Sequence, residues 1–287
     1  MKNSSSKKPC PYCSSAGIYF FEIGKREYFR CSTCDLIFKP AHSLGDAGVL
    51  EFYGHRYFDE YSHDELSGKR TNIYHHILDL IECKLKTGNI LDVGCGCGFF
   101  LDEARRRGWR ISGLDPSEKS IIHAEKKLGC PLVKGTLRDF SGPQDYDVVT
   151  MINVLDHSVS PWEEVRLARG MLKRDGWIFL RFPNGGFHPA VFRLARKFGV
   201  EKAFQRLVVF HEYSFTAAFI RKLLSDFSFS DIEIQNSVTS GNPASGCAGI
   251  YDFIFTRLTA VVFKLIALLA GAENLYGPSL EVMARKT

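Results

Sequence analysis

Two groups of residues in this sequence have the types and the spacing that binding chemistry requires. The first is the run Ile90-Leu-Asp-Val-Gly-Cys-Gly-Cys-Gly98, in which an apolar segment leads directly into alternate glycines. Glycine allows the backbone to turn tightly and to approach a ligand closely. A second apolar segment, Trp109–Leu114, ends in Asp115, whose carboxylate is placed to accept hydrogen bonds from two ribose hydroxyls. The pattern predicts a nucleoside-binding loop.

The spacing of the glycines distinguishes two kinds of nucleoside cofactor. A dinucleotide-binding loop has the pattern G-x-G-x-x-G, whereas here the third glycine comes one residue earlier. Asp92 also precedes the loop, and an acid at this position would repel a pyrophosphate. It suits a ligand that carries an ammonium group and no phosphate. The loop therefore favours S-adenosylmethionine over NAD.

The second group is a quartet of cysteines near the N-terminus. Two CxxC pairs, Cys10 with Cys13 and Cys31 with Cys34, are separated by seventeen residues. This spacing is typical of a zinc ribbon, in which two turns place four thiolates tetrahedrally. Gly24 and Lys25 lie midway and predict the turn of a hairpin between strands at Gly17–Ile23 and Arg26–Arg30. No open coordination position is apparent, so we expect a structural zinc site; two disulfides are the alternative.

The elements that must position these residues alternate along the chain from Asn89 onward. Regular β-α alternation with nearly continuous apolar strands indicates a parallel sheet covered on both faces. A helix over Asn72–Lys86 precedes it. The expected strands are Asn89–Val93, Trp109–Leu114, Pro131–Lys134, Tyr146–Ile152, Trp177–Phe182, Asp231–Asn236 and Leu280–Arg285, and the expected helices are Phe99–Arg107, Glu118–Leu128, Trp162–Leu172 and Thr216–Phe227.

Several short motifs then resemble a known family. LDVGCGCG followed by GLDPS resembles motif I and the acidic motif after it in class I S-adenosylmethionine-dependent methyltransferases. NVLDH, RFPN and HEYSFT resemble the small-molecule branch that includes ubiquinone-type O-methyltransferases, and the resemblance covers roughly residues 50–235 and the final SLEVMARK. It implies an α/β, doubly wound, seven-stranded, mostly parallel sheet of order 3-2-1-4-5-7-6 with the last strand antiparallel.

The resemblance also implies which residues bind the cofactor. The glycines would shape the methionine pocket above Asp92, and Asp115 would bind the ribose. Thr136 stands where many relatives have an acid that contacts the adenine amine. The resemblance therefore does not decide whether this residue makes the same contact here. Tyr57 either closes the site or packs in an aromatic cluster, and Arg70 is either a ligand contact or a solvated helix residue. The expected set is Asp92, Gly94, Cys95, Gly96, Gly98, Asp115, Pro116, Thr136, Leu137, Asn153, Tyr57 and Arg70.

Catalysis of methyl transfer needs an in-line nucleophile, exclusion of water and, for a hydroxyl acceptor, a base. Asp156 and His157 follow the fourth strand of the sheet, and we expect His157 to act as the base with Asp156 orienting it. Asp156 capping the next loop is the alternative. His211 is a second candidate base. Cys95 and Cys97 are expected to fill the loop, because transfer from a sulfonium needs no covalent enzyme intermediate.

Composition limits the partners. The net charge is +5, which is too small to indicate nucleic acid, and the N-terminus lacks the apolar run of a secretory signal. Nine cysteines without such a signal fit a reducing cytoplasm. We therefore expect a cytoplasmic enzyme that methylates a small molecule such as a sugar, a lipid-linked compound or a natural-product intermediate, with oxygen favoured. A nucleic-acid methyltransferase that holds RNA or DNA with its ribbon, and a non-catalytic scaffold, are the alternatives.

The sequence divides into a ribbon at residues 1–42 and a methyltransferase domain at residues 43–287. Within the domain, 43–86 are expected to form N-terminal helices, and 185–210 and 250–272 to roof the acceptor pocket. Both roof segments mix basic and apolar residues, which fits an acidic amphiphile, a nucleotide-sugar or peripheral contact with the inner face of a membrane. A lid with a solvated basic face is the plainer interpretation.

Overall fold

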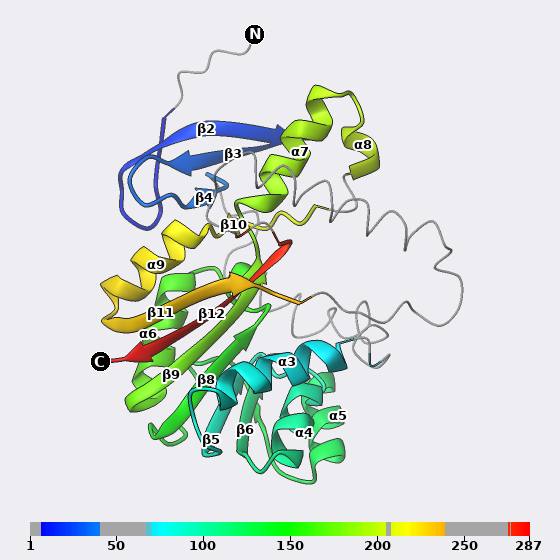
Figure 1. The fold of residues 1–287 in the computed structure, drawn as a ribbon, viewed down its shortest axis with the longest axis vertical. Helices are drawn as coiled ribbons and strands as arrows, with labels where there is room; N and C mark the ends of the chain where they lie inside the picture. Colours follow the sequence, from blue (N-terminus) through cyan, green and yellow to red (C-terminus); the bar gives the residue numbers. More distant parts are fainter. Residues whose placement is uncertain (1–6, 41–67, 69, 205–207, 239–274, 276) are drawn as a thin grey trace.

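The computed structural model describes residues 7–40, 68, 70–204, 208–238, 275 and 277–287. These residues form two sheets, one large and one small, that lie next to each other (Figure 1). Residues 43–67 and 250–272, and with them Tyr57 and one of the two expected roof segments, fall outside the described part. The following account concerns the described residues.

The large sheet has seven strands, of which one runs opposite to the others. Its order is β11 (Phe229–Asn236), β12 (Ser279–Lys286), β9 (Leu172–Pro183), β8 (Tyr146–Ile152), β5 (Asn89–Val93), β6 (Arg110–Asp115) and β7 (Val133–Lys134). Strand β12 pairs antiparallel with both β9 and β11, and the pairs from β9 to β7 are parallel. Counted along the chain this is 3-2-1-4-5-7-6, so the predicted order and the antiparallel last strand are confirmed.

Both faces of the sheet are covered, as the continuous apolar strands predicted. Successive side chains of a strand point to opposite faces. Ile90 of β5 accordingly packs with the helices α3 (Thr71–Glu82), α4 (Phe99–Arg106) and α5 (Glu118–Leu128). Leu91 and Val93 pack on the other face, with α6 (Pro161–Met171) and α9 (Ala217–Asp226). The ligand crevice of such a sheet lies beyond the carboxyl ends of its parallel strands.

Local signals explain several of the boundaries, and some predicted boundaries were wrong. Helix α5 begins where the Ser117 hydroxyl accepts a hydrogen bond from the amide of Ser120, and it ends at Gly129 with φ of 65°. Helix α3 stops at Glu82 instead of Lys86, because the amides of Lys84 and Leu85 both bond back to the carbonyl of Ile81 in a tight final turn.

Strand β9 begins at Leu172, five residues before the predicted start at Trp177. Leu172 pairs with Tyr146 of β8, and the pairing then shifts register before Val148 meets Trp177. An irregularity of this kind places charged residues inside a strand and hides its start from a search for apolar runs.

The small sheet contains the N-terminal ribbon and one strand from far along the chain. Its order is β1 (Lys8–Pro9), β2 (Ala16–Ile23), β3 (Arg26–Cys31), β4 (Ile37–Phe38) and β10 (Tyr213–Ser214). Gly24 has φ of 60° in the turn between β2 and β3, which confirms the predicted hairpin. The division of the chain at residue 42 stays a prediction, because residues 41–67 lie outside the described part.

The segment 185–210 was expected to roof the acceptor pocket. It contains α7 (Phe187–Lys197) and α8 (Glu201–Phe204), and α7 lies beside the ribbon (Figure 1). Phe192 of α7 packs against Phe21 with ring centroids 6.2 Å apart, and Arg196 pairs with Glu22 at 3.5 Å. Its role as a roof stays a prediction. Among the described helices, none has the length and apolarity to cross a membrane.

Candidate active site

The glycine loop between β5 and α4 depends on backbone conformations that other residues avoid. Gly94, Gly96 and Gly98 have φ of 72°, 52° and 76°. A Cβ added at Gly94 would lie 2.5 Å from Cγ2 of Val154, so the loop approaches the segment after β8 closely. A Cβ at Gly98 would lie 3.0 Å from side-chain atoms of Ala124 and Leu128, so this glycine allows α4 to pack against α5.

Two buried carboxylates flank the loop, Asp92 in the strand before it and Asp115 at the end of the neighbouring strand. Asp92 accepts a hydrogen bond from the Thr150 hydroxyl at 2.6 Å. Asp115 at the end of β6 accepts hydrogen bonds from the amide of Gly96 at 2.9 Å and the amide of Ser117 at 2.8 Å. Each carboxylate oxygen has two lone pairs, so Asp115 can accept ligand hydroxyls in addition to these amides. Asp115 thus contacts the loop directly, and the binding of the cofactor by these two acids stays a prediction.

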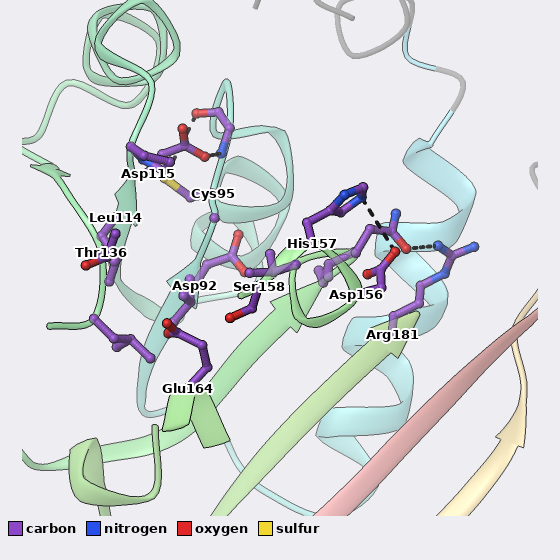
Figure 2. A pocket seen from close by; sticks show the side chains of 18 of the residues that line it. Asp92, Cys95, Leu114, Asp115, Thr136, Asp156, His157, Ser158, Glu164 and Arg181 are labelled. Carbon is purple, nitrogen blue, oxygen red and sulfur yellow. Dashed lines mark hydrogen bonds and ion pairs between the residues drawn. The ribbon is translucent and has the colours of Figure 1, made fainter. Parts of the chain in front are cut away.

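These residues line a cavity of about 650 Å³ at the carboxyl edge of the sheet (Figure 2). Of the twelve predicted cofactor residues, ten line it. Gly98 does not, because it packs between helices, and Tyr57 lies outside the described residues. The ten are Arg70, Asp92, Gly94, Cys95, Gly96, Asp115, Pro116, Thr136, Leu137 and Asn153.

The cysteines of the loop are both buried, with 6% of Cys95 and 1% of Cys97 exposed. The Cys95 sulfur lies against Gly113 of β6, where an added Cβ would come within 3.0 Å of it. Thiols enclosed in this way fill space between the loop and the sheet, and a nucleophile would need access to solvent and a stabilised thiolate.

Thr136 lines the cavity, and its own hydrogen bonds stay within the loop after β7. Asp139 accepts from both the amide and the hydroxyl of Thr136, at 3.0 and 2.8 Å. These bonds lower the pKa of Asp139, the backbone bond most. The loop after β7 is therefore ordered by its own carboxylate.

The three predicted catalytic residues meet at one point of the cavity wall. Nε2 of His211 lies 3.3 Å from Oδ2 of Asp156, and Nε2 of His157 lies 3.5 Å from the same oxygen. The two imidazole rings have centroids 4.1 Å apart. His157 follows β8 within the short helix η2 (Leu155–His157), whereas His211 comes from the segment before β10. The tertiary structure thus joins residues more than fifty positions apart.

Burial controls the protonation of this trio. It lowers the pKa of His157 to about 4, and burial with the neighbouring His157 lowers the pKa of His211 to about 4. Burial raises the pKa of Asp156, and the nearby His211 opposes that rise. Neither carboxylate oxygen of Asp156 has a hydrogen bond within the described structure, and its side chain is buried. Both imidazoles are accordingly neutral near pH 7 and able to accept a proton.

Arg181 is a largely buried, charged residue of the cavity wall that the sequence analysis did not single out. Arg181 of β9 donates to the side-chain oxygen of Asn153 at 2.6 Å and to the Ser237 hydroxyl at 2.9 Å, and Ser237 donates to buried Glu281 at 2.7 Å. Burial lowers the pKa of Arg181, and Glu281 opposes this most strongly. The available signal was a charged residue inside the apolar run Trp177–Phe182, because buried charges are rare unless paired.

Arg181 also shapes the turn after β8. Asn153 has φ of 57°, donates its amide to the carbonyl of Arg181 at 2.8 Å and accepts from the guanidinium. This turn places Asn153 and Asp156 at the cavity, and Figure 2 shows Asp156 lying between His157 and Arg181.

The four N-terminal cysteines form a second cluster, away from the cavity. Their sulfurs all lie within 4.8 Å of one another, with Cys10 to Cys34 at 3.6 Å and Cys13 to Cys31 at 3.5 Å. The two turns are alike, because Ser14 and Asp35 each follow the first cysteine of their pair by four residues and have φ of 60° and 68°. The amides of Thr33 and Cys34 point at the Cys31 sulfur, at 3.4 and 3.5 Å.

Comparison with known proteins agrees with this geometry. The model of the methyltransferase domain family matches residues 63–234, more than half of the chain. The chain is 31% identical over 124 residues to a ubiquinone biosynthesis O-methyltransferase of Azoarcus, which is 40% of this chain and 53% of that protein. A protein of the same name from Saccharophagus degradans is 32% identical over 102 residues, 33% of this chain and 43% of that one. The match thus spans about half the length of these relatives.

Solved structures show the same fold. A S-adenosylmethionine-dependent methyltransferase from Thermotoga maritima has a TM-score of 0.53 at 17% identity, covering 81% of this chain and 97% of that one. Magnesium protoporphyrin IX methyltransferase from Synechocystis, solved with bound S-adenosylmethionine, has a TM-score of 0.52 at 17% identity, covering 86% and 100%. The chain therefore belongs to the methyltransferase domain family and carries the domain of a S-adenosylmethionine-dependent methyltransferase.

Proposed function

We propose that this protein transfers the methyl group of S-adenosylmethionine to a hydroxyl of a small molecule. The observation that carries the proposal is the pair of buried carboxylates that flank the glycine loop, Asp92 in the strand before it and Asp115 beside it. Such a loop repels phosphate and suits a ligand with a ribose and an ammonium group. Membership of the methyltransferase family supports the same cofactor.

The reaction needs no covalent intermediate between the protein and the methyl group. A lone pair of the acceptor oxygen forms the new O–CH₃ bond while the S–CH₃ bond breaks, and its electrons return to sulfur, which leaves a neutral thioether. The proton of the acceptor hydroxyl passes to a base. His157 and His211 both offer a neutral imidazole beside Asp156, which then stabilises the imidazolium that forms. The remaining requirement is alignment within a cavity that excludes water.

The size and the lining of the cavity support a small molecule as the acceptor. Ligand pockets commonly measure about 300–1,000 Å³, and a cavity of about 650 Å³ has room for the cofactor beside a compact acceptor. We place the acceptor beside the trio of Asp156, His157 and His211; apolar Val159 and Val209 also line the cavity. Curated relatives named as ubiquinone biosynthesis O-methyltransferases support an oxygen atom as the methyl acceptor.

Calorimetry with the full chain tests the cofactor. We expect micromolar affinity for S-adenosylmethionine and for S-adenosylhomocysteine, and no heat with NAD. Tight binding of NAD without binding of either sulfur nucleoside would refute the proposal.

Transfer of a radioactive methyl group to a catechol probe tests the reaction and the base. His157→Ala and His211→Ala should each lower kcat by about 10²- to 10⁴-fold if that imidazole is the base. The affinity for S-adenosylmethionine should stay unchanged in both. His123→Ala on α5 serves as the matched control. Unchanged kcat in both active-site variants would exclude a histidine base.

We further infer that the four N-terminal cysteines hold a structural zinc ion. A tetrahedral zinc with Zn–S bonds of about 2.3 Å separates its sulfurs by about 3.8 Å, close to the 3.5 and 3.6 Å of the two facing pairs. The amides that point at the Cys31 sulfur are suited to a thiolate. Metal analysis should find one zinc per chain, lost in Cys10→Ser. Two disulfides, detected by a mass increase of the chain on reduction, would contradict the inference.

A further inference from the structure

We propose that the N-terminal ribbon is part of the acceptor site and acts as the platform that holds His211 and Val209 in the cavity wall. The proposal rests on the proposed function, because it concerns the same cavity. Its subject is the segment Val208–Glu212, here called the strap, which runs between the ribbon and the cavity into β10. No described residue of the ribbon lines the cavity itself, so the ribbon would act through the strap.

The side chains of the strap point alternately to the cavity and to the ribbon. Val209 and His211 line the cavity. Val208 and Phe210 pack instead against the ribbon cluster formed by Phe21, Tyr28, Ile37 and, from α7, Phe192. This pattern is expected of an extended chain, because its successive side chains point to opposite sides. Each residue that faces the cavity is therefore flanked by residues that face the ribbon.

On the N-terminal side of His211, aromatic packing attaches the strap to the ribbon. The ring of Phe210 lies 5.1 Å from that of Phe21 and 5.6 Å from that of Tyr28, centroid to centroid. Phe21 and Tyr28 in turn stack on each other at 4.9 Å with an angle of 8° between their planes. Aromatic pairs of this kind add about 0.5–1.5 kcal/mol beyond the area that they bury.

On the C-terminal side, hydrogen bonds and an ion pair attach the strap. The amide of Lys39 donates to the carbonyl of Glu212 at 3.0 Å, and the Lys39 ammonium lies 2.5 Å from the Glu212 carboxylate. Beyond them Phe38 pairs with Tyr213 and Ile37 with Ser214, so β4 and β10 form one ladder. His211 is thus enclosed between two attachments, and both lead to the ribbon.

The opposite side of the strap is held by the methyltransferase domain. The amide of Val209 points to Nδ1 of His188 at 3.4 Å, and the other ring nitrogen of His188 bonds to the carbonyl of Pro278 at 2.9 Å. His211 reaches Asp156 across the cavity wall. The distance between this imidazole and Asp156 therefore depends on contacts made by residues 21–39.

The ion pair between Lys39 and Glu212 is the contact that can be removed with least risk to folding. We compare Lys39→Met and Glu212→Gln with Lys84→Met and Glu233→Gln, a pair of the same 2.5 Å length between the turn after α3 and β11. Three quantities are measured in each: affinity for S-adenosylmethionine by calorimetry, kcat with the catechol probe, and the rate at which diethyl pyrocarbonate modifies His211, read by mass spectrometry. His75, whose side chain is 46% exposed, is the internal reference for the last.

We expect unchanged affinity for S-adenosylmethionine in all four variants, because the strap does not line the cofactor end. Lys39→Met and Glu212→Gln should lower kcat about tenfold, since small misplacements of a reacting group are costly. They should also raise the modification rate of His211 about threefold by loosening the strap. Lys39→Arg should restore both quantities, and the two control variants, Lys84→Met and Glu233→Gln, should leave both at the wild-type values.

Other outcomes overturn the proposal. If Lys39→Met and Glu212→Gln match the control pair in kcat and in His211 reactivity, the ribbon does not position the strap. If cofactor affinity falls together with kcat, the ribbon supports the whole domain and not the acceptor wall. Phe210→Leu, which keeps an apolar side chain, repeats the comparison through the other attachment. A wild-type chain that binds no S-adenosylmethionine would refute the proposed function instead, a result that the calorimetry gives separately.

Discussion

At the scale of single residues, the central feature is a carboxylate whose hydrogen bonds serve two purposes. Asp115 orders the glycine loop through the amide of Gly96 and starts α5 through the amide of Ser117. In the proposed function its remaining lone pairs accept the ribose hydroxyls. The same side chain would then connect cofactor binding to the shape of the loop.

Replacing Asp115 with asparagine tests this connection. The amide has one accepting oxygen instead of two, and hydrogen bonds to a charged acceptor are worth about 1.5–3 kcal/mol each, so affinity for S-adenosylmethionine should fall about 10- to 100-fold. Glu118→Gln, which removes an exposed ion pair with Lys134 at the residue directly after the Ser117 cap, should bind normally. Equal affinity in Asp115→Asn and wild type, measured by calorimetry, would show that Asp115 is structural only.

At the scale of elements, the site is built by the ends of strands and the loops between them. Strand β5 supplies the glycine loop, β6 supplies Asp115, and the turn after β8 supplies Asn153, Asp156 and His157. The close approach of the glycine loop to the turn after β8 is set by Gly94, whose added Cβ would meet Val154. The glycine loop and the turn after β8 can therefore pack together only if residue 94 has no side chain.

Gly94→Ala should disturb both loops. Its φ of 72° is unfavourable for alanine, and the new Cβ would lie 2.5 Å from Val154. Gly129→Ala is the matched control, because φ is 65° there but nothing lies within 4 Å of the added atom. We expect the control to cost about 1 kcal/mol in the free energy of unfolding.

Gly94→Ala should cost about 2–4 kcal/mol and weaken cofactor binding, because the steric clash adds to the backbone strain. Urea unfolding and calorimetry measure the two effects. Equal losses of stability in Gly94→Ala and Gly129→Ala would mean that the loop at Gly94 shifts without cost.

At the scale of the whole molecule, the ribbon and the large sheet share a continuous core. Cys10, Cys31, Cys34 and Phe38 belong to the same buried cluster as residues of α9 such as Phe219. Tyr12 packs on Phe219 with ring centroids 5.3 Å apart and donates a hydrogen bond to Asp226 at 2.5 Å. The ribbon is thus packed into the fold over much of its length.

Buried His188 connects three parts of this molecule: α7, the strap and the segment before β12. Its Nδ1 lies 3.4 Å from the amide of Val209, and its Nε2 lies 2.9 Å from the carbonyl of Pro278, so the ring must be neutral with its proton on Nε2. Burial lowers the pKa of His188 to about 4, below its usual 6.5. Stability from the neutral ring is complete above about pH 6.5 and is lost as the pH falls toward 4, because the unfolded chain then binds the proton more tightly.

The expected loss from His188 between pH 7 and pH 5 is about 1–2 kcal/mol in the free energy of unfolding. Urea unfolding at several pH values measures it. His188→Gln should reduce the pH dependence by about this amount, whereas His123→Gln on α5 should leave it unchanged. An identical slope in His188→Gln and wild type would show that the ring takes up its proton without disturbing the fold.

Much of this architecture follows from local patterns. The continuous apolar strands predicted the sheet, and the alternate glycines with the acids at 92 and 115 predicted where its binding loop lies, because these features depend on neighbours along the chain. The strand order came from resemblance to a family. Arg181 was missed, because its partners Asn153, Ser237 and Glu281 are distant in sequence and only their pairing makes a charge acceptable inside a sheet.

By itself the sequence determined the residue types at the site, the helical and extended segments that carry them and the four-cysteine spacing of the ribbon. Only the tertiary structure decided that β10 joins the ribbon to form one sheet and that His211 meets His157 at Asp156. The physical reason is that two-residue strands such as β4 and β10 have no periodicity to recognise. Their pairing is stabilised by the packing around them, and this packing exists only in the folded chain.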